Sequence, residues 1–204
     1  MKQCRIFILA AALGISSTAF ASGPSSIFGQ EMARTINDGD VQFDLMGSGN
    51  THLRMGAFDG ELIFNVSASN AQYKKSTSEN FAVYGGLGIT TMATSTTTLV
   101  IGAAYTSTQD NMFFNLNPVI TSSAGTTSIN VGLGAFMPLT TGKSVRGKVL
   151  AGLAVDLPVS PSSNSTILLG LRWEVKPNLT LEAGLYNTGT GLQFPGLFRI
   201  NLAL

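Results

Sequence analysis

The sequence has little cysteine, little histidine and little charge. Among its 204 residues Cys4 is the single cysteine and His52 the single histidine, which excludes intrachain disulfides and cysteine-metal sites. Charged residues make up 11%, against roughly 25% in ordinary soluble domains. With 12 basic and 11 acidic residues, no basic excess indicates binding of nucleic acid.

The start of the chain is typical of a signal peptide. Lys2 and Arg5 flank the beginning of an apolar stretch at 6–15, and Ala19-Phe20-Ala21 is a small-x-small cleavage pattern. The apolar stretch is shorter than the roughly 20 residues that a membrane-spanning helix needs, which favours cleavage over an uncleaved anchor. We therefore interpret residues 1–21 as a signal peptide.

Residues 22–40 form an N-terminal segment without a clear pattern. Ile27, Phe28 and Met32 would share one face of a short helix, but Gly29 and Gly39 weaken that helix. We expect an ordered tail or linker, with a short plug or a periplasmic contact as the alternative.

From residue 41 to the end, apolar residues alternate with polar or small ones. In the last segment Phe198, Ile200, Leu202 and Leu204 fall on one face, because side chains of a strand point alternately to opposite sides. No apolar run after the leader reaches helix-spanning length, so a membrane crossing would have to use strands. The predicted strands lie near 41–45, 53–57, 61–68, 81–90, 99–106, 129–137, 145–156, 167–176, 179–186 and 197–204.

This pattern predicts an all-β chain: an antiparallel, up-and-down transmembrane β-barrel over 41–204. We prefer ten strands, with eight or twelve open, because bacterial barrels have even strand counts. Residues 112–121 are ambiguous, since Pro118 would remove a ladder donor. With both termini periplasmic, periplasmic turns are expected near 58–60, 92–97, 138–144 and 176–178, and outer loops near 47–51, 70–80, 108–126, 157–165 and 187–196.

The polar face would line the barrel interior and carries charges of both signs. Paired charges can satisfy one another in a small lumen. The candidate charge network is Arg172, Glu174, Glu182, Arg199, Lys148 and Asp156, with Arg199 as a partner of Glu182. The same face is rich in glycine, which either leaves space along the lumen or permits sharp bending; we favour bending.

A soluble periplasmic β domain would show the same alternation. The polar face, however, is poor in Lys and Glu, and the alternation continues into the last residue, which favours the membrane barrel.

The leader, the alternating segments of about ten residues and the carboxyl-terminal strand together resemble small outer-membrane β-barrel proteins of Gram-negative bacteria. The resemblance implies location in the cell outer membrane, contact with its lipid and lipopolysaccharide, and recognition by the barrel-assembly machinery. Members commonly end in Phe or another aromatic residue, whereas this chain ends in Leu204.

We expect a structural or interaction role through the outer loops. The first alternative is a narrow channel for small solutes, indicated by the polar, glycine-rich inner face. The second is a lipid-modifying enzyme that uses His52. A serine partner could come from Ser48, but nothing in the spacing singles it out, and no Gly-x-Ser-x-Gly or metal-binding motif is present. An enzyme is therefore not expected, and neither is a cofactor or a metal.

Overall fold

The computed structural model describes residues 25–46, 51–66, 69–90, 96–109, 112–139, 147–159, 165–176, 179–187 and 192–203. Every regular element in this part of the chain is a β-strand, and all strand pairs are antiparallel, as the sequence predicts. No helix of the described residues is long and apolar enough to cross a membrane. The predicted signal peptide lies outside the described residues.

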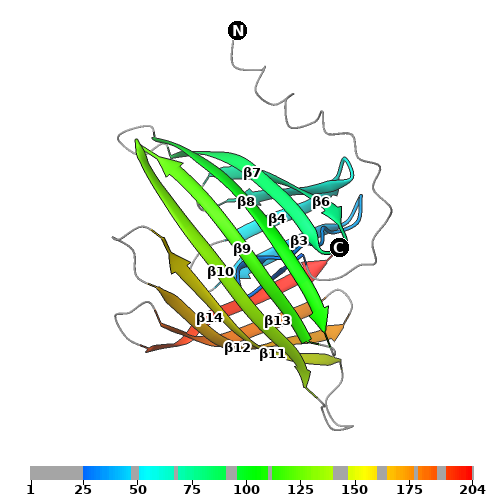
Figure 1. Cartoon of the computed structure of the whole chain (residues 1–204). Helices are drawn as coiled ribbons and strands as arrows, with labels where there is room; N and C mark the ends of the chain where they lie inside the picture. Colours follow the sequence, from blue (N-terminus) through cyan, green and yellow to red (C-terminus); the bar gives the residue numbers. More distant parts are fainter. Residues whose placement is uncertain are drawn as a thin grey trace.

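Twelve strands form one sheet whose order is closed. From β3 to β14, each strand pairs with the next strand in the sequence (Figure 1). Strand β14 also pairs with β3, from Ala203 opposite Gln42 to Arg199 opposite Met46. The strands are β3 (Val41–Met46), β4 (Thr51–Ala57), β5 (Gly60–Asn65), β6 (Asn70–Ser78), β7 (Phe81–Thr90), β8 (Thr96–Gln109), β9 (Met112–Ser123), β10 (Thr126–Leu139), β11 (Lys148–Pro158), β12 (Thr166–Lys176), β13 (Leu179–Asn187) and β14 (Leu192–Ala203).

The preferred count of ten strands is corrected to twelve, one of the two counts left open. The expected outer loop at 70–80 contains β6, and the expected loop at 108–126 contains β9. The outward positions of β6 are Ala71, Tyr73 and Lys75, which do not produce an apolar alternation that the sequence pattern can reveal.

Strand β9 accommodates its proline with help from a neighbouring side chain. Pro118 has no N–H, and it lies opposite Ala103 between the paired positions of β8 and β9. The Nδ2 group of Asn117 donates instead to the carbonyl oxygen of Ala103 at 2.7 Å. The barrel wall therefore continues through a residue that ordinarily interrupts a central strand.

The two ends of the barrel differ in their connections. We call the end at which β3 begins and β14 ends the terminal end. There the connections 58–59, 79–80, 110–111 and 177–178 have two residues each, while 140–147 is longer. The sequence predicts a turn near 92–97 at this end. In the structure the β7–β8 connection lies at the opposite end, because the additional strand β6 reverses the direction of β7 and β8.

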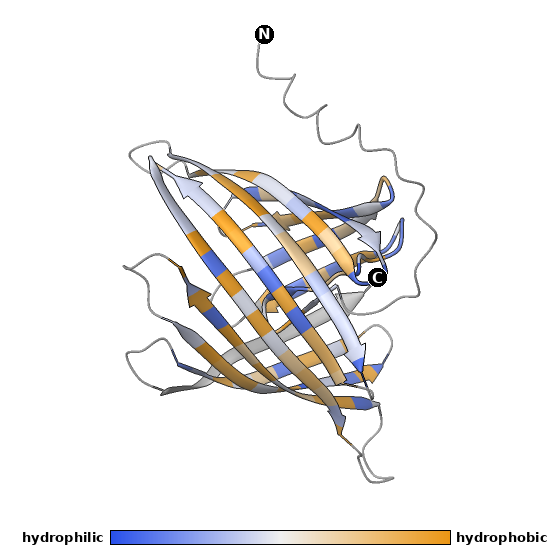
Figure 2. Ribbon diagram, in the orientation of Figure 1, coloured by the Kyte–Doolittle hydropathy of each residue, from blue (hydrophilic) through white to orange (hydrophobic). Residues whose placement is uncertain are grey.

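The outer face is apolar around the described wall. Ile101 is 51% exposed and Leu169 55% exposed. Hydrophobic and hydrophilic residues alternate along many of the strands (Figure 2). Among the outward positions of the strands whose side chains are described, the charged residues are Lys75 and, after the bulge at the end of β12, Lys176, which is in register with Leu179. The inner face instead contains the buried polar side chains Asp44, Arg54, Glu61, Lys74, Thr106, Asn115, Asn117, Arg172, Thr180 and Glu182.

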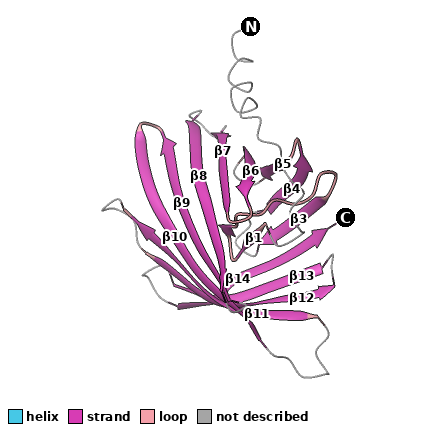
Figure 3. Ribbon diagram, turned by 45° about the vertical axis from the view of Figure 1, so that its right-hand side comes forward, coloured by secondary structure: helices cyan, strands magenta, loops and turns pink. Residues whose placement is uncertain are grey.

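Residues 25–36, which we call the inner segment, lie inside the ring of strands (Figure 3), and residues 37–39 are exposed before β3 begins. Strands β1 (Ser26–Ile27) and β2 (Gln30–Glu31) pair with each other. Phe28 and Gly29 make the turn between them with positive φ angles of 49° and 81°. Ile27 and Ala33 have no exposed surface. The inner segment is therefore a filling of the barrel, which was the alternative to a tail or linker.

Candidate functional site in the barrel interior

The inner segment is hydrogen-bonded to many parts of the wall. Its backbone N–H groups donate to three wall side chains: Phe28 to Glu182 at 3.1 Å, Glu31 to Asn117 at 3.4 Å and Ala33 to Thr106 at 2.9 Å. Because an unpaired buried N–H costs free energy, these wall groups satisfy a segment that has only four strand residues of its own. The wall is thus fitted to the backbone of this segment.

The largest polar contact is the Arg54 cluster, formed by Arg54, Asp44, Glu61, Lys74 and Glu31. The Arg54 guanidinium contacts Glu31 at 2.6 Å, Glu61 at 2.6 Å and Asp44 at 2.8 Å. The Lys74 ammonium contacts Glu31 at 2.8 Å and Glu61 at 3.1 Å. Arg54, Lys74, Glu61 and Asp44 are almost completely buried. Glu31 is the one member contributed by the inner segment.

The electrostatic environment of Glu31 is dominated by two cations. Burial by itself raises the pKa of a carboxyl group, but the charges and hydrogen bonds of Arg54 and Lys74 outweigh burial. They hold the pKa of Glu31 well below its usual value. Glu31 is therefore ionised at neutral pH and joins the inner segment to β4 and β6.

A smaller ion-pair group lies on β12 and β13. The Nη1 group of Arg172 contacts Glu182 at 2.5 Å, and the Nε group contacts Glu174 at 3.4 Å. Arg172 also donates to the backbone carbonyl of Ser26 at 3.2 Å. Three members of the predicted charge network are thus brought together, and two of them, Arg172 and Glu182, also contact the inner segment.

The other three members lie elsewhere. Asp156 accepts a hydrogen bond from Gln30 of the inner segment at 3.1 Å. Lys148 is exposed at the beginning of β11, in register with Glu174, and makes no ion pair with another described residue. Arg199 is in register with Glu182, as predicted, but its side chain lies outside the described part of the structure. The six residues that the sequence predicts as one network therefore do not form a single network in the structure.

An apolar cluster also lies in the interior, against parts of β10, β11 and β12. Ile27, Phe28 and Met32 of the inner segment pack there in one buried cluster whose wall members are Phe136, Leu150, Ala154 and Leu168. The rings of Phe28 and Phe136 have centroids 5.7 Å apart and are tilted by 48°. The inner segment is thus held both by hydrogen bonds to charged wall residues and by this apolar cluster.

Inner-face glycines create space for these aromatic rings. A Cβ atom on Gly152 would lie 2.4 Å from Phe136 and 2.5 Å from Phe28, and one on Gly170 would lie 3.1 Å from Phe28. At these positions, the interpretation that glycine leaves room in the lumen fits better than the favoured bending interpretation. The room is occupied by the chain itself.

The residues considered for catalysis do not form a recognisable catalytic arrangement. His52 is partly buried on the inner face of β4, in register with Asp44 on β3 and Asn65 on β5. Ser48 lies outside the described residues. Within the described ranges, no group of three or more His, Cys, Asp or Glu side chains could hold a metal ion.

Sequence reasoning missed Glu31 and Lys74 as parts of the interior network. The Tyr73-Lys74-Lys75 run does not reveal which lysine points inward until β6 is placed between β5 and β7. Glu31 lies in a segment without a strand pattern. Its available signal was a lone acidic residue next to the apolar Ile27, Phe28 and Met32, which is compatible with a buried segment that needs a cationic partner.

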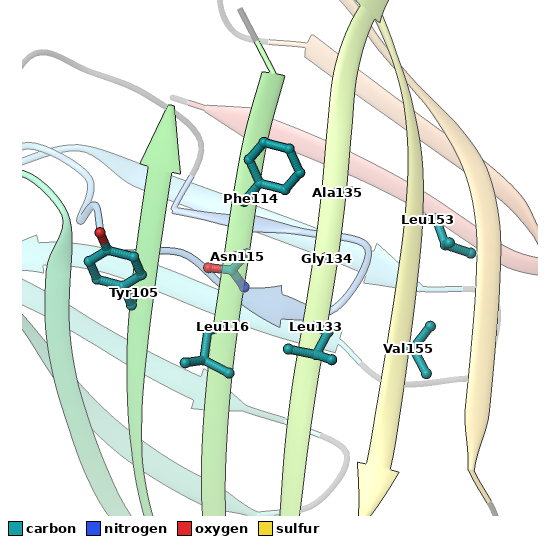
Figure 4. A pocket seen from close by; sticks show the side chains of 9 residues that line it. All are labelled: Tyr105, Phe114, Asn115, Leu116, Leu133, Gly134, Ala135, Leu153 and Val155. Atoms are coloured by element: carbon teal, nitrogen blue, oxygen red, sulfur yellow. The ribbon is translucent and has the colours of Figure 1, made fainter. Parts of the chain in front are cut away.

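A shallow apolar groove crosses the outer face of β8–β11 (Figure 4). It has a volume of about 500 Å³ and is lined by Tyr105, Phe114, Asn115, Leu116, Leu133, Gly134, Ala135, Leu153 and Val155. No protein-family model matches the chain, and comparisons with curated proteins and with solved structures found no match.

Proposed function

We propose that the protein is an outer-membrane β-barrel with a closed interior and a structural or interaction role in the cell envelope. The observation that carries the proposal is the combination of an apolar outer face with a buried, ion-paired interior. In a soluble β domain the apolar side chains would face the interior and the charged ones the solvent. Here the arrangement is inverted.

The composition of the outer face supports lipid as its surroundings. A charged Lys or Arg on the lipid face of a barrel costs about 2–4 kcal/mol at the bilayer midplane. The outward positions of the described strands avoid this cost, apart from Lys75 of β6 and Lys176 at the last position of β12. The groove on β8–β11 would accept lipid acyl chains, since its outward side chains are apolar or aromatic.

The strands on one side of the barrel, β7–β12, are long enough to cross a membrane, whereas β3–β5 on the other side are short. A tilted spanning strand needs about 9–11 residues. Strands β7–β12 have 10–14 residues, whereas β3, β4 and β5 have six, seven and six. The bilayer would therefore have to thin locally beside β3–β5, a known response to hydrophobic mismatch.

The terminal end is proposed to face the periplasm. Short periplasmic turns are typical of bacterial outer-membrane barrels, and four of the five connections at this end have two residues. Outer contacts with lipopolysaccharide or a protein partner would then use the opposite end. The longest connection between strands at that end is 159–165, so such contacts would use short connections.

The filled interior favours a structural or interaction role over a permanently open channel. Residues of the inner segment contact β4, β5, β6, β8, β9, β10, β11, β12 and β13. The interior of an eight-stranded barrel can be filled by side chains alone, and a twelve-stranded barrel encloses more space. This chain fills the additional space with its own N-terminal residues.

Cell fractionation tests the proposal. The protein is expected in the outer-membrane fraction as a detergent-requiring band whose electrophoretic mobility changes on heating. Purified protein in planar bilayers is expected to be stable and electrically silent. Recovery from the soluble periplasmic fraction would contradict the membrane assignment and support the soluble β domain, while steady conductance would support the narrow channel.

A further inference from the structure

We infer that the inner segment is a removable plug, and that its displacement opens a path through the barrel for ions and small polar solutes. The inference rests on the proposed membrane location. It adds an activity that the closed form does not show.

The wall does not depend on the inner segment for its strand pairing. Each of the twelve strands pairs with two other wall strands, and β1 and β2 pair with each other alone. Residues 25–36 contact the wall through side chains and single hydrogen bonds instead of through a strand ladder. Backbone pairing gives the wall a source of stability that would survive displacement of the segment.

The charged wall residues also keep partners without the inner segment. Arg54 would retain Asp44 and Glu61, and Lys74 would retain Glu61 at 3.1 Å. Removal of Glu31 leaves two cations and two carboxylates in this cluster, so its net charge becomes zero. On the other side, Arg172 and Glu182 remain paired with each other. Displacement therefore leaves none of these buried charges unpaired, which would otherwise cost several kcal/mol.

The surface uncovered by displacement would be largely polar on one side. Besides the two ion-paired groups, Thr106, Asn115 and Asn117 line β8 and β9, and all three now contact the inner segment or one another. Such groups can hydrogen-bond to water in an open path. The space would be the volume that residues 25–36 now occupy.

Two anchors keep the closed form dominant. Glu31 connects the segment to Arg54 and Lys74, and Phe28 packs in the apolar cluster with Phe136. Opening would expose this apolar cluster to water, which is unfavourable. The closed state is therefore expected in the unmodified protein, and weakening both anchors should increase the open fraction.

Single-channel recording in planar bilayers tests the plug. The full chain in a Cys4→Ser background is compared with the double variant Phe28→Ala/Glu31→Gln and with Glu79→Gln, which removes an exposed carboxylate between β6 and β7. The double variant is expected to conduct potassium chloride with an open fraction at least tenfold above that of the parent. Glu79→Gln should behave as the parent does.

Cross-linking shows whether the path requires movement of the segment. Ala33 and Ser76 are in contact, since the Ser76 hydroxyl donates to the Ala33 carbonyl at 2.5 Å. Cysteines at both positions, joined by a reducible bis-methanethiosulfonate linker, should silence the double variant, and reduction should restore its conductance.

Three results would contradict the plug. The first is that the double variant, inserted and heat-modifiable, conducts no ions even after reduction of the linker. The second is that it conducts ions with the linker in place, and the third is that the parent protein has as large an open fraction as the double variant. Failure of the proposed membrane location is a separate result, because it would appear as absence from the outer-membrane fraction.

Discussion

The ring of Phe28 occupies the space that Gly152 leaves on the inner face of β11. A Cβ atom at position 152 would lie 2.5 Å from this ring, closer than real Cβ contacts permit. One residue belongs to the inner segment and the other to the wall. Their complementarity connects the glycine content of the inner face with the filling of the barrel.

Enlarging this glycine should loosen the inner segment. Gly152→Val forces the valine methyl groups against Phe28 and Phe136, and overpacking of this kind costs about 1–3 kcal/mol. Hydrogen exchange of residues 25–36 should accelerate while exchange in the wall strands changes less. Gly85→Val is the matched control, since Gly85 points outward and a Cβ there meets only Val100 O at 3.4 Å. Equal acceleration in both variants would contradict the close fit.

Loss of the central arginine should destabilise the whole barrel. Arg54→Met leaves three carboxylates with Lys74 alone, and breaking a buried ion pair in this way costs about 3–5 kcal/mol. Denaturant unfolding in lipid or detergent measures the change. Lys176→Met, which removes an exposed charge at the end of β12, should alter the unfolding free energy by much less. Similar losses in the two variants would show that the Arg54 cluster is not a stabilising centre.

Glu31 should make stability depend on pH in the acid range. Its pKa is lowered in the folded protein, so the unfolded chain binds a proton first as the pH falls. The stabilisation is fully present above the unfolded-state pKa of about 4.3 and is lost as the pH falls toward the folded-state value. Unfolding free energy measured between pH 3 and pH 7 should fall less steeply for Glu31→Gln than for the parent. Identical slopes would remove Glu31 as a contributor.

A charge on the outer face should oppose insertion. Leu169→Arg places a guanidinium on an outward position of β12, where the expected cost is about 2–4 kcal/mol at the bilayer midplane. Folding yield into lipid vesicles should decrease. Asn80→Arg, in the exposed turn between β6 and β7, provides the control. An unchanged or higher yield for Leu169→Arg would indicate that this face contacts water.

The outer face could be predicted from sequence because its alternation depends on each strand alone. Leu169 and Leu171 point outward whatever strand lies beside them. Strand β6 was missed because Tyr73 is the only large apolar residue among its outward positions. Strand β9 was left ambiguous because Pro118 and the adjacent Phe113 and Phe114 obscure its period.

The contacts of the interior could be predicted only where neighbouring strands follow directly in sequence. The β12–β13 hairpin places Arg172 opposite Glu182, and these two residues are paired. Lys148 and Glu174 are also in register, yet Lys148 is exposed at the first position of its strand. The position of Glu31 depends on residues 25–36 folding into the barrel, and no local periodic pattern in the sequence predicts that.

Spin-label accessibility measured in lipid bilayers tests the central claim most directly. In a Cys4→Ser background, single labels at Leu168, Leu169 and Ala33 report the inner wall, the outer wall and the inner segment. The label at 169 should collide with lipid-soluble oxygen and not with a water-soluble nickel complex, and the labels at 168 and 33 should be shielded from both. Free access of the nickel complex to position 169 or to position 33 would contradict a lipid-facing barrel filled by its own N-terminal segment.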